Sequence, residues 1–423
     1  MYRTARFLAL FIFASLSVAS FAQFVNGQND DWARWRGAQG NGVAAASQTP
    51  PTSFGPETNV VWKAKIPGRG HSSPIVVDDK IFLATAEKSS GSQSVVCVER
   101  SSGKQVWKTE INNGGLAGYI HRNNTHASST VATDGERLFV TFSHHGNVEV
   151  AVLDFDGKEV WKKTVGVYKP AFPFGYGASP IIHDGMVIVT NENKGDAAVV
   201  AYKVDSGDEV WKIDRKGVTS YSTPVVANVA GRDQLLLSGG QRVASYDPAT
   251  GEELWSCPAS WKVTCGTMVW DGDLVFASGG FPSQETLAIN AKTGEKVWSN
   301  ASKCYEQSMI VNDGCLYGHA DNGVIYCWRA KDGTELWKQR FAERKRATVS
   351  ASPVLAGGNI YFTAENGECV VIKANPGKYE EVARNKLGNV AFSSMAICGN
   401  QIFTRVGEQT GDEFQWLYCL GEK

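Results

Sequence analysis

The residues of this 423-residue chain best suited to chemistry gather in one short stretch, His121-Arg122-Asn123-Asn124-Thr125-His126. Histidine binds metal ions and changes charge near neutral pH. The stretch lies in a connection, 109–127, that is longer than most loops, and long loops are more often functional. A zinc site would need a third ligand, which the sequence does not identify. The other reading is an ordinary polar loop, so the metal stays unknown.

Basic and aromatic residues recur in comparable connecting segments. In a ring of repeats they would form an electropositive mouth with an aromatic wall, suited to an anionic ligand or an acidic peptide. The alternative is scattered solvated charge, with aromatic rings that plug the entrance. The bases are Arg69, Arg122, Lys169, Lys216, Lys262, Lys303 and Arg344-Lys345-Arg346, and the aromatic residues are Tyr119, Phe172, Phe174, Tyr176, Tyr221, Trp261 and Tyr305. His71, His144, His145 and His319 fall in similar segments, and only His183 does not.

These segments supply the predicted binding residues of one face. They are Arg69, His71, His121, Arg122, His126, Tyr176, Tyr221, Arg344, Lys345 and Arg346. No catalytic residue is predicted, because the chain has no Gly-x-Ser-x-Gly elbow, no His-Glu-x-x-His and no phosphate-binding glycine loop. Gly37–Gly42 is glycine-rich, but no strand before it and no helix after it is evident, so it is interpreted as a flexible leader.

A repeated phrase defines the elements that must position these residues. Six copies of a Gly-x-x-x-Trp pattern, such as Thr250–Trp255 and Thr293–Trp298, end in tryptophans spaced 39 to 54 residues apart. Two apolar runs of strand length precede each phrase, and the glycine allows a tight turn. One four-stranded blade per repeat fits this spacing, with each tryptophan packed between neighbouring sheets. The predicted docking residues are Trp62, Trp107, Trp161, Trp211, Trp255, Trp298 and Trp337.

The count of outer strands predicts an all-β propeller with eight antiparallel blades; seven blades is the alternative. An eighth unit, 350–384, has no tryptophan on its outer strand and is expected to be looser. The last segment, 392–420, has only three strands. The strand at 59–66 would complete this blade and close the ring, which removes an exposed sheet edge.

The N-terminal region has the pattern of a secretory signal. Residues 1–22 combine Arg3 and Arg6 with an apolar run and small residues at 20 and 22. A membrane anchor or a buried helix is the alternative. We therefore expect three parts: a signal peptide (1–22), a leader that caps the ring (23–58) and the propeller (59–423). No later segment is apolar enough to cross a membrane, so a periplasmic or extracellular protein is predicted.

Cysteine content and charge limit the partners. Nine cysteines leave at least one unpaired; a Cys257–Cys265 bridge is possible. The net charge of −1 gives no general attraction to nucleic acid. We expect a monomer that binds a protein or an anionic small molecule.

The Thr-Gly-x-x-x-Trp phrases resemble those of the quinoprotein (PQQ-type) repeat family, over roughly residues 59–420. The resemblance implies one of two activities. One branch contains quinone-dependent alcohol and glucose dehydrogenases, which hold pyrroloquinoline quinone with Ca²⁺ beside an adjacent Cys-Cys pair. The other contains BamB-like scaffolds without a cofactor. WD-type propellers have similar repeat lengths, but here Trp is followed by Lys or Ser rather than Asp.

The chain is closer to the scaffold branch, because it has no Cys-Cys pair and little room for long insertions between blades. We expect an exported scaffold or binding module in the cell envelope that needs no cofactor and is not an enzyme. The alternative is a PQQ- and Ca²⁺-dependent oxidoreductase acting on an alcohol or a sugar. The expected lipid-attachment cysteine of an outer-membrane scaffold does not follow the apolar run.

Overall fold

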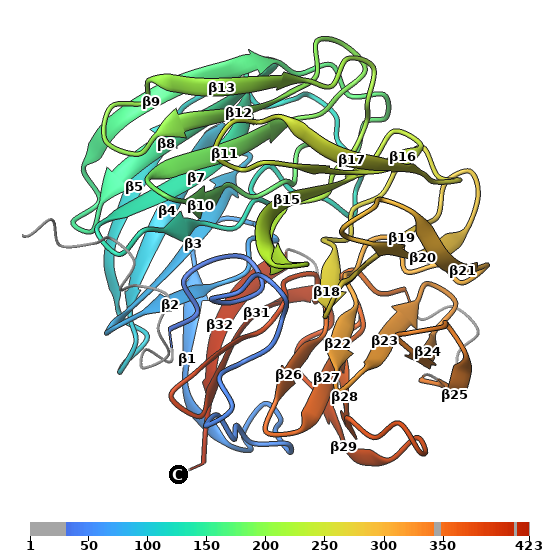
Figure 1. Ribbon diagram of the computed structural model, residues 1–423. Helices are drawn as coiled ribbons and strands as arrows, with labels where there is room; N and C mark the ends of the chain where they lie inside the picture. Colours follow the sequence, from blue (N-terminus) through green and yellow to red (C-terminus); the bar gives the residue numbers. More distant parts are fainter. Residues whose placement is uncertain (1–30, 342–347, 410–412, 423) are drawn as a thin grey trace, which may run out of the picture.

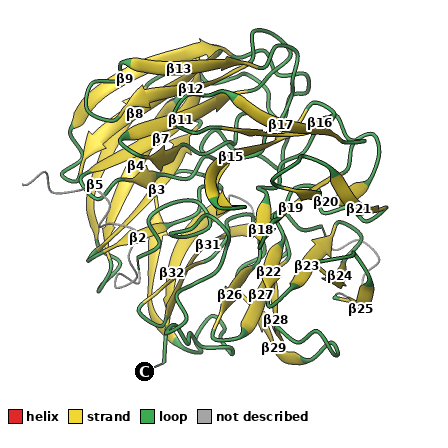
Figure 2. Ribbon diagram, viewed as in Figure 1, coloured by secondary structure: helices red, strands yellow, loops and turns green. Residues whose placement is uncertain are grey.

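The computed structural model describes residues 31–341, 348–409 and 413–422, and these residues contain thirty-two strands and no helix. The strands form eight four-stranded antiparallel sheets arranged in a ring (Figures 1 and 2). The predicted eight-bladed propeller is confirmed, and the alternative of seven blades is wrong. None of the described residues forms a helix of the length and apolarity that a membrane span requires.

Blades 1 to 7 each run from an inner to an outer strand in chain order. Blade 1 contains β2 (Ile75–Val77), β3 (Lys80–Glu87), β4 (Ser92–Glu99) and β5 (Gln105–Asn112). Blade 2 contains β6 (Ala132–Thr133), β7 (Arg137–His144), β8 (Asn147–Asp154) and β9 (Glu159–Val167). Blade 3 contains β10 (Ile181–His183), β11 (Met186–Asn191), β12 (Ala198–Lys203) and β13 (Glu209–Asp214). Blade 4 contains β14 (Val225–Val229), β15 (Arg232–Gly239), β16 (Arg242–Tyr246) and β17 (Glu253–Pro258).

The second half of the ring repeats this order. Blade 5 contains β18 (Val269–Asp271), β19 (Leu274–Gly279), β20 (Glu285–Asn290) and β21 (Lys296–Asn300). Blade 6 contains β22 (Ile310–Asn312), β23 (Cys315–Ala320), β24 (Val324–Arg329) and β25 (Glu335–Arg340). Blade 7 contains β26 (Val354–Ala356), β27 (Asn359–Thr363), β28 (Glu368–Lys373) and β29 (Glu381–Lys386). Blade 8 contains β30 (Ala396–Cys398), β31 (Gln401–Gln409), β32 (Glu413–Leu420) and, from the start of the chain, β1 (Val60–Ile66).

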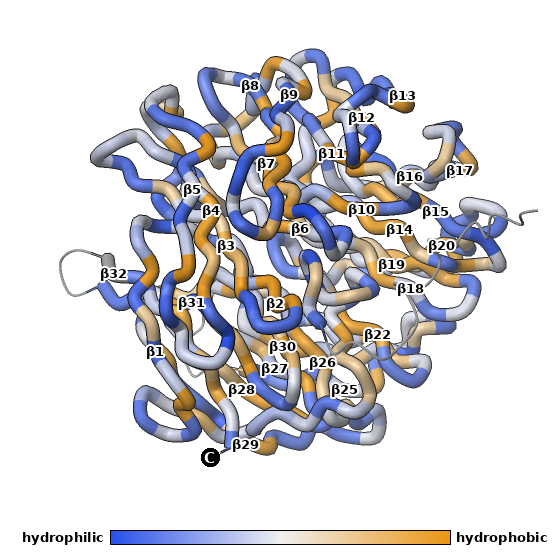
Figure 3. Tube along the Cα trace, turned by 90° about the vertical axis from the view of Figure 1, so that its left-hand side faces the viewer, coloured by the Kyte–Doolittle hydropathy of each residue, from blue (hydrophilic) through white to orange (hydrophobic). Residues whose placement is uncertain are grey.

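The first strand closes the ring as the sequence predicts. β1 pairs antiparallel with β32, with Trp62 opposite Cys419 and Lys63 opposite Tyr418. The last blade is therefore made from both ends of the propeller. Figure 3 shows hydrophobic stretches along inner strands such as β14, β18 and β22, and hydrophilic residues at many outer turns. The sheets pack face to face around the ring through these apolar residues.

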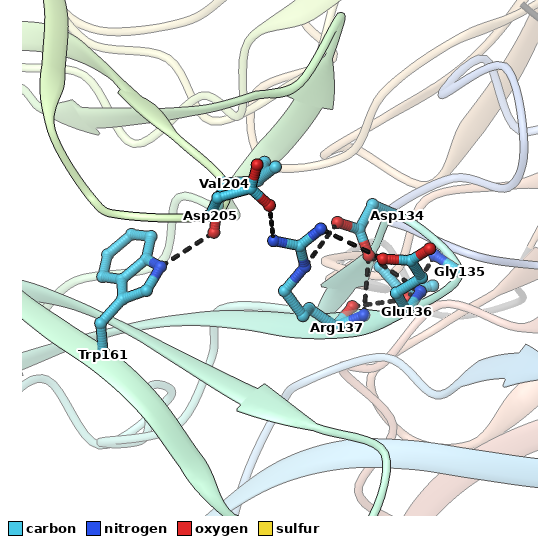
Figure 4. Close-up of polar contacts among 8 residues, drawn as sticks. Asp134, Gly135, Glu136, Arg137, Trp161, Val204 and Asp205 are labelled. Atoms are coloured by element: carbon cyan, nitrogen blue, oxygen red, sulfur yellow. Dashed lines mark hydrogen bonds and ion pairs between the residues drawn. The ribbon is translucent and has the colours of Figure 1, made fainter. Parts of the chain in front are cut away.

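The repeated tryptophans dock each blade onto the next. The indole of Trp161 in blade 2 donates a hydrogen bond of 2.8 Å to the carbonyl of Val204 in blade 3 (Figure 4). A Cβ on Gly207 would come within 3.0 Å of the same ring. Arg137 of blade 2 adds an ion pair with Asp205 of blade 3 across this junction and a second one with Asp134 in its own blade. Equivalent indole bonds from the other tryptophans reach Arg100, Phe155, Pro248, Ala291, Ala330 and Asn375.

A β-bulge recurs on the outer strand of every blade, immediately before the tryptophan position. In blade 1, Cys97 pairs with Trp107 and Val98 pairs with Gln105, so Val106 is left unpaired and exposed. The bulged residues of the other blades are Val160, Val210, Leu254, Val297, Leu336, Val382 and Val61. A bulge twists an edge strand away from further pairing, so eight exposed edges are protected from edge-to-edge association.

The leader at 31–58 runs across the inner strands. Trp32 bridges to Val76 in blade 1, and Val43 bridges to Leu355 in blade 7. Arg36, 3% exposed, donates hydrogen bonds of 2.6 Å to the carbonyls of Met309 and Asn41. Other leader contacts reach Thr133, Ile182, Thr267 and Asn400, so all blades but blade 4 take part in these bonds. Burial lowers the pKa of Arg36 to about 9, and the side chain remains charged at neutral pH.

The leader also fills the place of the missing tryptophan. Ala383 of blade 7 occupies the position held by tryptophan in the other blades. Phe54, 4% exposed, packs in the same apolar cluster, and its backbone N–H donates to Asn385 Oδ1 at 2.9 Å. The expectation of a looser unit is wrong, because this leader segment fills the junction between blades 7 and 8.

All nine cysteines are described, and none is bonded to another. The possible Cys257–Cys265 bridge is therefore absent. Eight of the thiols are buried, and burial raises the pKa of Cys97 to about 12. The cysteines serve as small core residues, and Cys265 alone is partly exposed.

Candidate functional site

Two long connections rise from blades 1, 2 and 3 and are bound to each other. The first, residues 113–131, links β5 to β6, and the second, residues 168–180, links β9 to β10. The backbone N–H of His121 donates to the carbonyl of Pro173 at 2.6 Å, and Asn124 Nδ2 donates to the carbonyl of Phe174. These two bonds hold the loops at a defined distance; the first needs no particular side chain, whereas the second depends on the amide of Asn124.

A cavity of about 390 Å³ lies between these loops and the top of blade 2. Its rim is exposed and includes Ala117, Tyr119, Pro170 and Pro173, and the exposed fraction of Tyr119 is 69%. Its floor is buried and consists of Thr125, Ser129, Thr141, Phe142, Tyr168 and Tyr176. The cavity therefore runs from solvent into the propeller, and its volume lies within the range of ligand pockets.

The polar groups of the floor are bonded to one another or to backbone. Tyr176 Oη donates to the carbonyl of Thr190 at 2.8 Å, and Tyr168 Oη donates to the carbonyl of Gly175 at 2.7 Å. Ser129 Oγ and Thr141 Oγ1 are 2.7 Å apart. Burial raises the pKa of Tyr168 and of Tyr176, so both phenols stay protonated.

The cavity is uncharged inside and lies beside cations. No Asp, Glu, Lys or Arg is among its lining residues, all of which are described. His126 lines it, and its pKa is lowered, first by burial and then by Lys88 and Arg69. Arg122 and Lys169 are exposed in the two loops, each within three residues of a lining residue.

Aromatic contacts extend from the cavity toward neighbouring blades. Phe174 contacts His121 edge-on at 5.5 Å and Tyr221 at 6.0 Å, both measured between ring centroids. Phe172 contacts Phe174 and, at 5.7 Å, the exposed Phe281 of blade 5. These rings join loops from blades 2 to 5 into one aromatic surface.

The structure brings together some of the residues predicted to bind. His121, Arg122, His126 and Tyr176 all belong to the two loops around the cavity. Arg69 donates to the carbonyls of Asn124, at 2.8 Å, and Arg122, at 3.3 Å, and so holds the first loop in place. Tyr221 belongs to the aromatic surface.

Other predicted residues lie elsewhere. His71 stacks on Phe392 of blade 8 at 4.3 Å, and burial, with Arg69 and Arg405, lowers its pKa well below the usual value. Trp261 is fully buried beneath Gly279 and does not belong to an aromatic wall. His319 lies on β23 between Phe341 and Phe362 rather than in a loop, and burial lowers its pKa to about 3. Arg344, Lys345 and Arg346 fall outside the described residues.

Carboxyl groups accompany the bases in the described part of blades 6 and 7. Lys303 forms a 3.0 Å ion pair with Asp321 in blade 6. Near this pair, Ser350 Oγ lies 2.6 Å from Glu306 Oε2 and 2.7 Å from Glu365 Oε1. Burial, followed by the carboxylates of Glu365 and Asp321, raises the pKa of Glu306 to about 7. Among the described residues, blades 6 and 7 thus place Asp321, Glu306 and Glu365 near Lys303, and the basic mouth stays a prediction.

The described residues contain no cluster of acidic side chains of the kind that holds the calcium of a bound quinone. Such a group requires converging oxygen ligands. Within residues 31–341, 348–409 and 413–422, no three His, Cys, Asp or Glu side chains are placed to hold a metal ion. No two cysteines are adjacent in the sequence. These side chains therefore do not form a calcium site by themselves, and whether the protein uses any cofactor stays a prediction.

Several lining residues were not identified from the sequence, among them Tyr168, Ser128, Phe142 and His145 as parts of one cavity. Tyr168 could have been noticed, since it begins the second long connection directly after a strand. The floor residues on β7 could not, because their strand pattern is the same as that of any core strand.

The ring of four-stranded blades, docked by Gly-x-x-x-Trp repeats, defines a PQQ-type repeat β-propeller with a pocket between its inter-blade loops. A family model described as outer membrane protein assembly factor BamB matches residues 91–339, more than half of the chain. The chain belongs to this family.

Individual proteins share part of this sequence or its fold. BamB of Burkholderia pseudomallei (strain K96243) is 24% identical over 372 residues, which cover 84% of this chain and 87% of that protein. A polyvinylalcohol dehydrogenase of a Pseudomonas species is 23% identical over 418 residues, 90% of this chain and 57% of that protein. A solved europium-containing methanol dehydrogenase shares the fold, with a TM-score of 0.69 and 11% identity, over 93% of this chain and 98% of that one.

Proposed function

We propose that this protein is an exported, non-catalytic propeller that binds a protein partner in the cell envelope and takes part in outer-membrane protein assembly. Membership of the BamB family supports this role. The observation that carries it is the cavity between the two long loops, whose shape is fixed before any ligand arrives.

Preorganisation is what makes this cavity suitable for binding. The loops are tied to each other through His121 and Asn124, and to blade 1 through Arg69. Ordering a loop on binding costs affinity, and a loop that is already ordered avoids this cost. The exposed Tyr119 beside the cavity and the aromatic surface around Phe172 have the composition of protein interfaces.

Export through the segment 1–22, a monomeric state and a periplasmic location belong to the same proposal. They are consistent with a scaffold that meets its partners outside the cytoplasm.

Deletion of the gene from its source bacterium, with complementation by the wild-type chain, tests the role. We expect fewer folded β-barrel proteins in the outer membrane, measured by their heat-modifiable electrophoretic mobility, and recovery on complementation. A photo-crosslinking amino acid at Tyr119 should capture a specific envelope protein, whereas the same amino acid at the distant, exposed Lys331 should not. Normal β-barrel levels after deletion would overturn the assembly role.

The second candidate is a PQQ- and Ca²⁺-dependent oxidoreductase for an alcohol or a sugar, favoured by the similarity to a polyvinylalcohol dehydrogenase. Titration of the purified chain with the quinone and Ca²⁺, followed by tryptophan fluorescence and by dye reduction, tests it. Tight binding with turnover would replace the scaffold proposal, and the absence of both would remove this candidate.

A further inference from the structure

The chemistry of the cavity floor restricts what the cavity can bind. The hydroxyls of Tyr168, Tyr176, Ser129 and Thr141 are engaged within the protein. Because these hydroxyls use their protons within the protein, they leave only acceptor lone pairs for a ligand, and a sugar placed against them would replace few of its hydrogen bonds to water. Phe142 and the two tyrosine rings offer apolar contact instead. The floor therefore favours an apolar or aromatic group.

The charge around the cavity restricts the ligand further. No charged side chain lines the interior, so an anion has no partner at the floor. The charged groups that shift the pKa of His126 are both cations, Lys88 and Arg69. Arg122 and Lys169 are exposed in the same two loops. Negative charge is thus favoured outside the cavity, and a neutral apolar group is favoured inside it.

We infer that this cavity binds an apolar or aromatic side chain of a partner protein's segment, with acidic residues flanking that side chain. The inference rests on the proposed protein-binding function and adds the chemistry of the partner. A side chain that fills a preformed pocket surrounded by weaker polar contacts is the usual form of an interface hot spot. The exposed ring of Tyr119 at the rim is placed to cover such a side chain.

Synthetic eight-residue peptides test this inference on the purified chain. The probe peptide has a central Phe flanked by Asp and Glu; two controls replace the Phe by Ala or the acids by Lys. Binding is measured by calorimetry at low and moderate salt. We expect the Ala peptide to bind at least tenfold more weakly, and the Lys peptide to show no binding. Added salt should weaken the binding of the probe peptide, because salt screens the attraction between surface charges.

Variants locate the binding. Ala117→Trp fills the exposed rim of the cavity and should abolish binding of the probe peptide. Lys169→Glu should weaken it at least tenfold, while Lys331→Glu, which makes the same change of charge on an exposed turn elsewhere, should leave it unchanged. Unfolding temperatures equal to that of the wild type show that the variants fold.

Undiminished binding to the Ala117→Trp variant, no binding of any peptide, or binding of a neutral disaccharide instead would overturn the inference. The outcome of the peptide experiment can be distinguished from the outcome of the gene deletion. If deletion impairs assembly but Ala117→Trp complements fully, the proposed function stands and the cavity is not its site. If the probe peptide binds as expected but deletion leaves assembly unchanged, the cavity chemistry stands and the assembly role does not.

Discussion

Replacing Trp255 by Ala should destabilise the propeller more than any surface change, because this ring joins blades 4 and 5. Trp255 is 6% exposed, and its indole N–H donates to the carbonyl of Ala291 and to Gln234 Oε1, both at 2.8 Å. A Cβ on Gly294 would lie 2.8 Å from Cβ of Trp255, so the two blades are in direct contact at this point.

The magnitude follows from area and from hydrogen bonding. A buried tryptophan removes roughly 200 Å² from water, worth up to about 5 kcal/mol at ~25 cal/mol per Å². Measured Trp→Ala changes in cores cost about 3–5 kcal/mol. We expect a loss of about 4 kcal/mol in the free energy of unfolding. Trp255→Phe keeps most of the apolar area and loses the indole bond, so it should cost about 1–2 kcal/mol.

The free energy of unfolding of both variants is measured by urea unfolding, followed by circular dichroism, once unfolding has been shown to be reversible. Glu252→Ala, an exposed change three residues away, is the control and should shift stability by less than about 0.5 kcal/mol. A cost below about 1 kcal/mol for Trp255→Ala would refute the argument that this ring holds two blades together.

Three further predictions concern other parts of the ring. Phe54→Ala should cost about 3 kcal/mol in thermal or urea unfolding, because Phe54 fills the junction beside Ala383; a neutral result would contradict that role. Because the pKa of Glu306 is raised to about 7, the folded state binds this proton more tightly, so stability should fall as pH rises from about 4.5 to about 7. In Glu306→Gln, the melting temperature should decrease less over this pH range than in the wild type. An equal decrease in both proteins would contradict the role of Glu306. Thiol titration of the denatured chain should find nine free thiols, and a count of seven would reveal a disulfide. In the native protein the thiols should react slowly, even that of Cys265, because burial raises its pKa.

The blades could be predicted from the sequence because their signals are local. A turn glycine, a tryptophan four residues later and two preceding apolar runs recur in most repeats, and each works within about 45 residues. The contacts of the leader were beyond such reasoning. Arg36 and Phe54 show no period, and their partners, Met309 and Asn385, lie more than 270 residues away.

The site could be predicted only in part. Loop length drew attention to the connection that carries His121 and His126, and His126 lines the cavity. The depth of the cavity depends on Tyr168 and Tyr176 bonding to backbone carbonyls, and carbonyls are the same at every residue. His319 was misplaced because it is the second-last residue of β23, where an error of two residues in a strand boundary turns a core position into a loop position. The ion pair of Lys303 with Asp321 could not be predicted without knowledge of the fold.

The leader that holds the ring together and the loops that form the cavity are separate parts of the chain. The leader bonds to the inner strands β2 and β26, at Val76 and Leu355, and to residues just before β18 and β22, at Thr267 and Met309. The cavity loops precede β6 and β10, and none of the cavity-lining residues takes part in these leader bonds. Residues such as Ala117 and Lys169 can therefore be changed without disturbing the leader or the docking tryptophans. This separation is why the peptide-binding variants should fold normally, and why a loss of binding in them would report on the cavity itself.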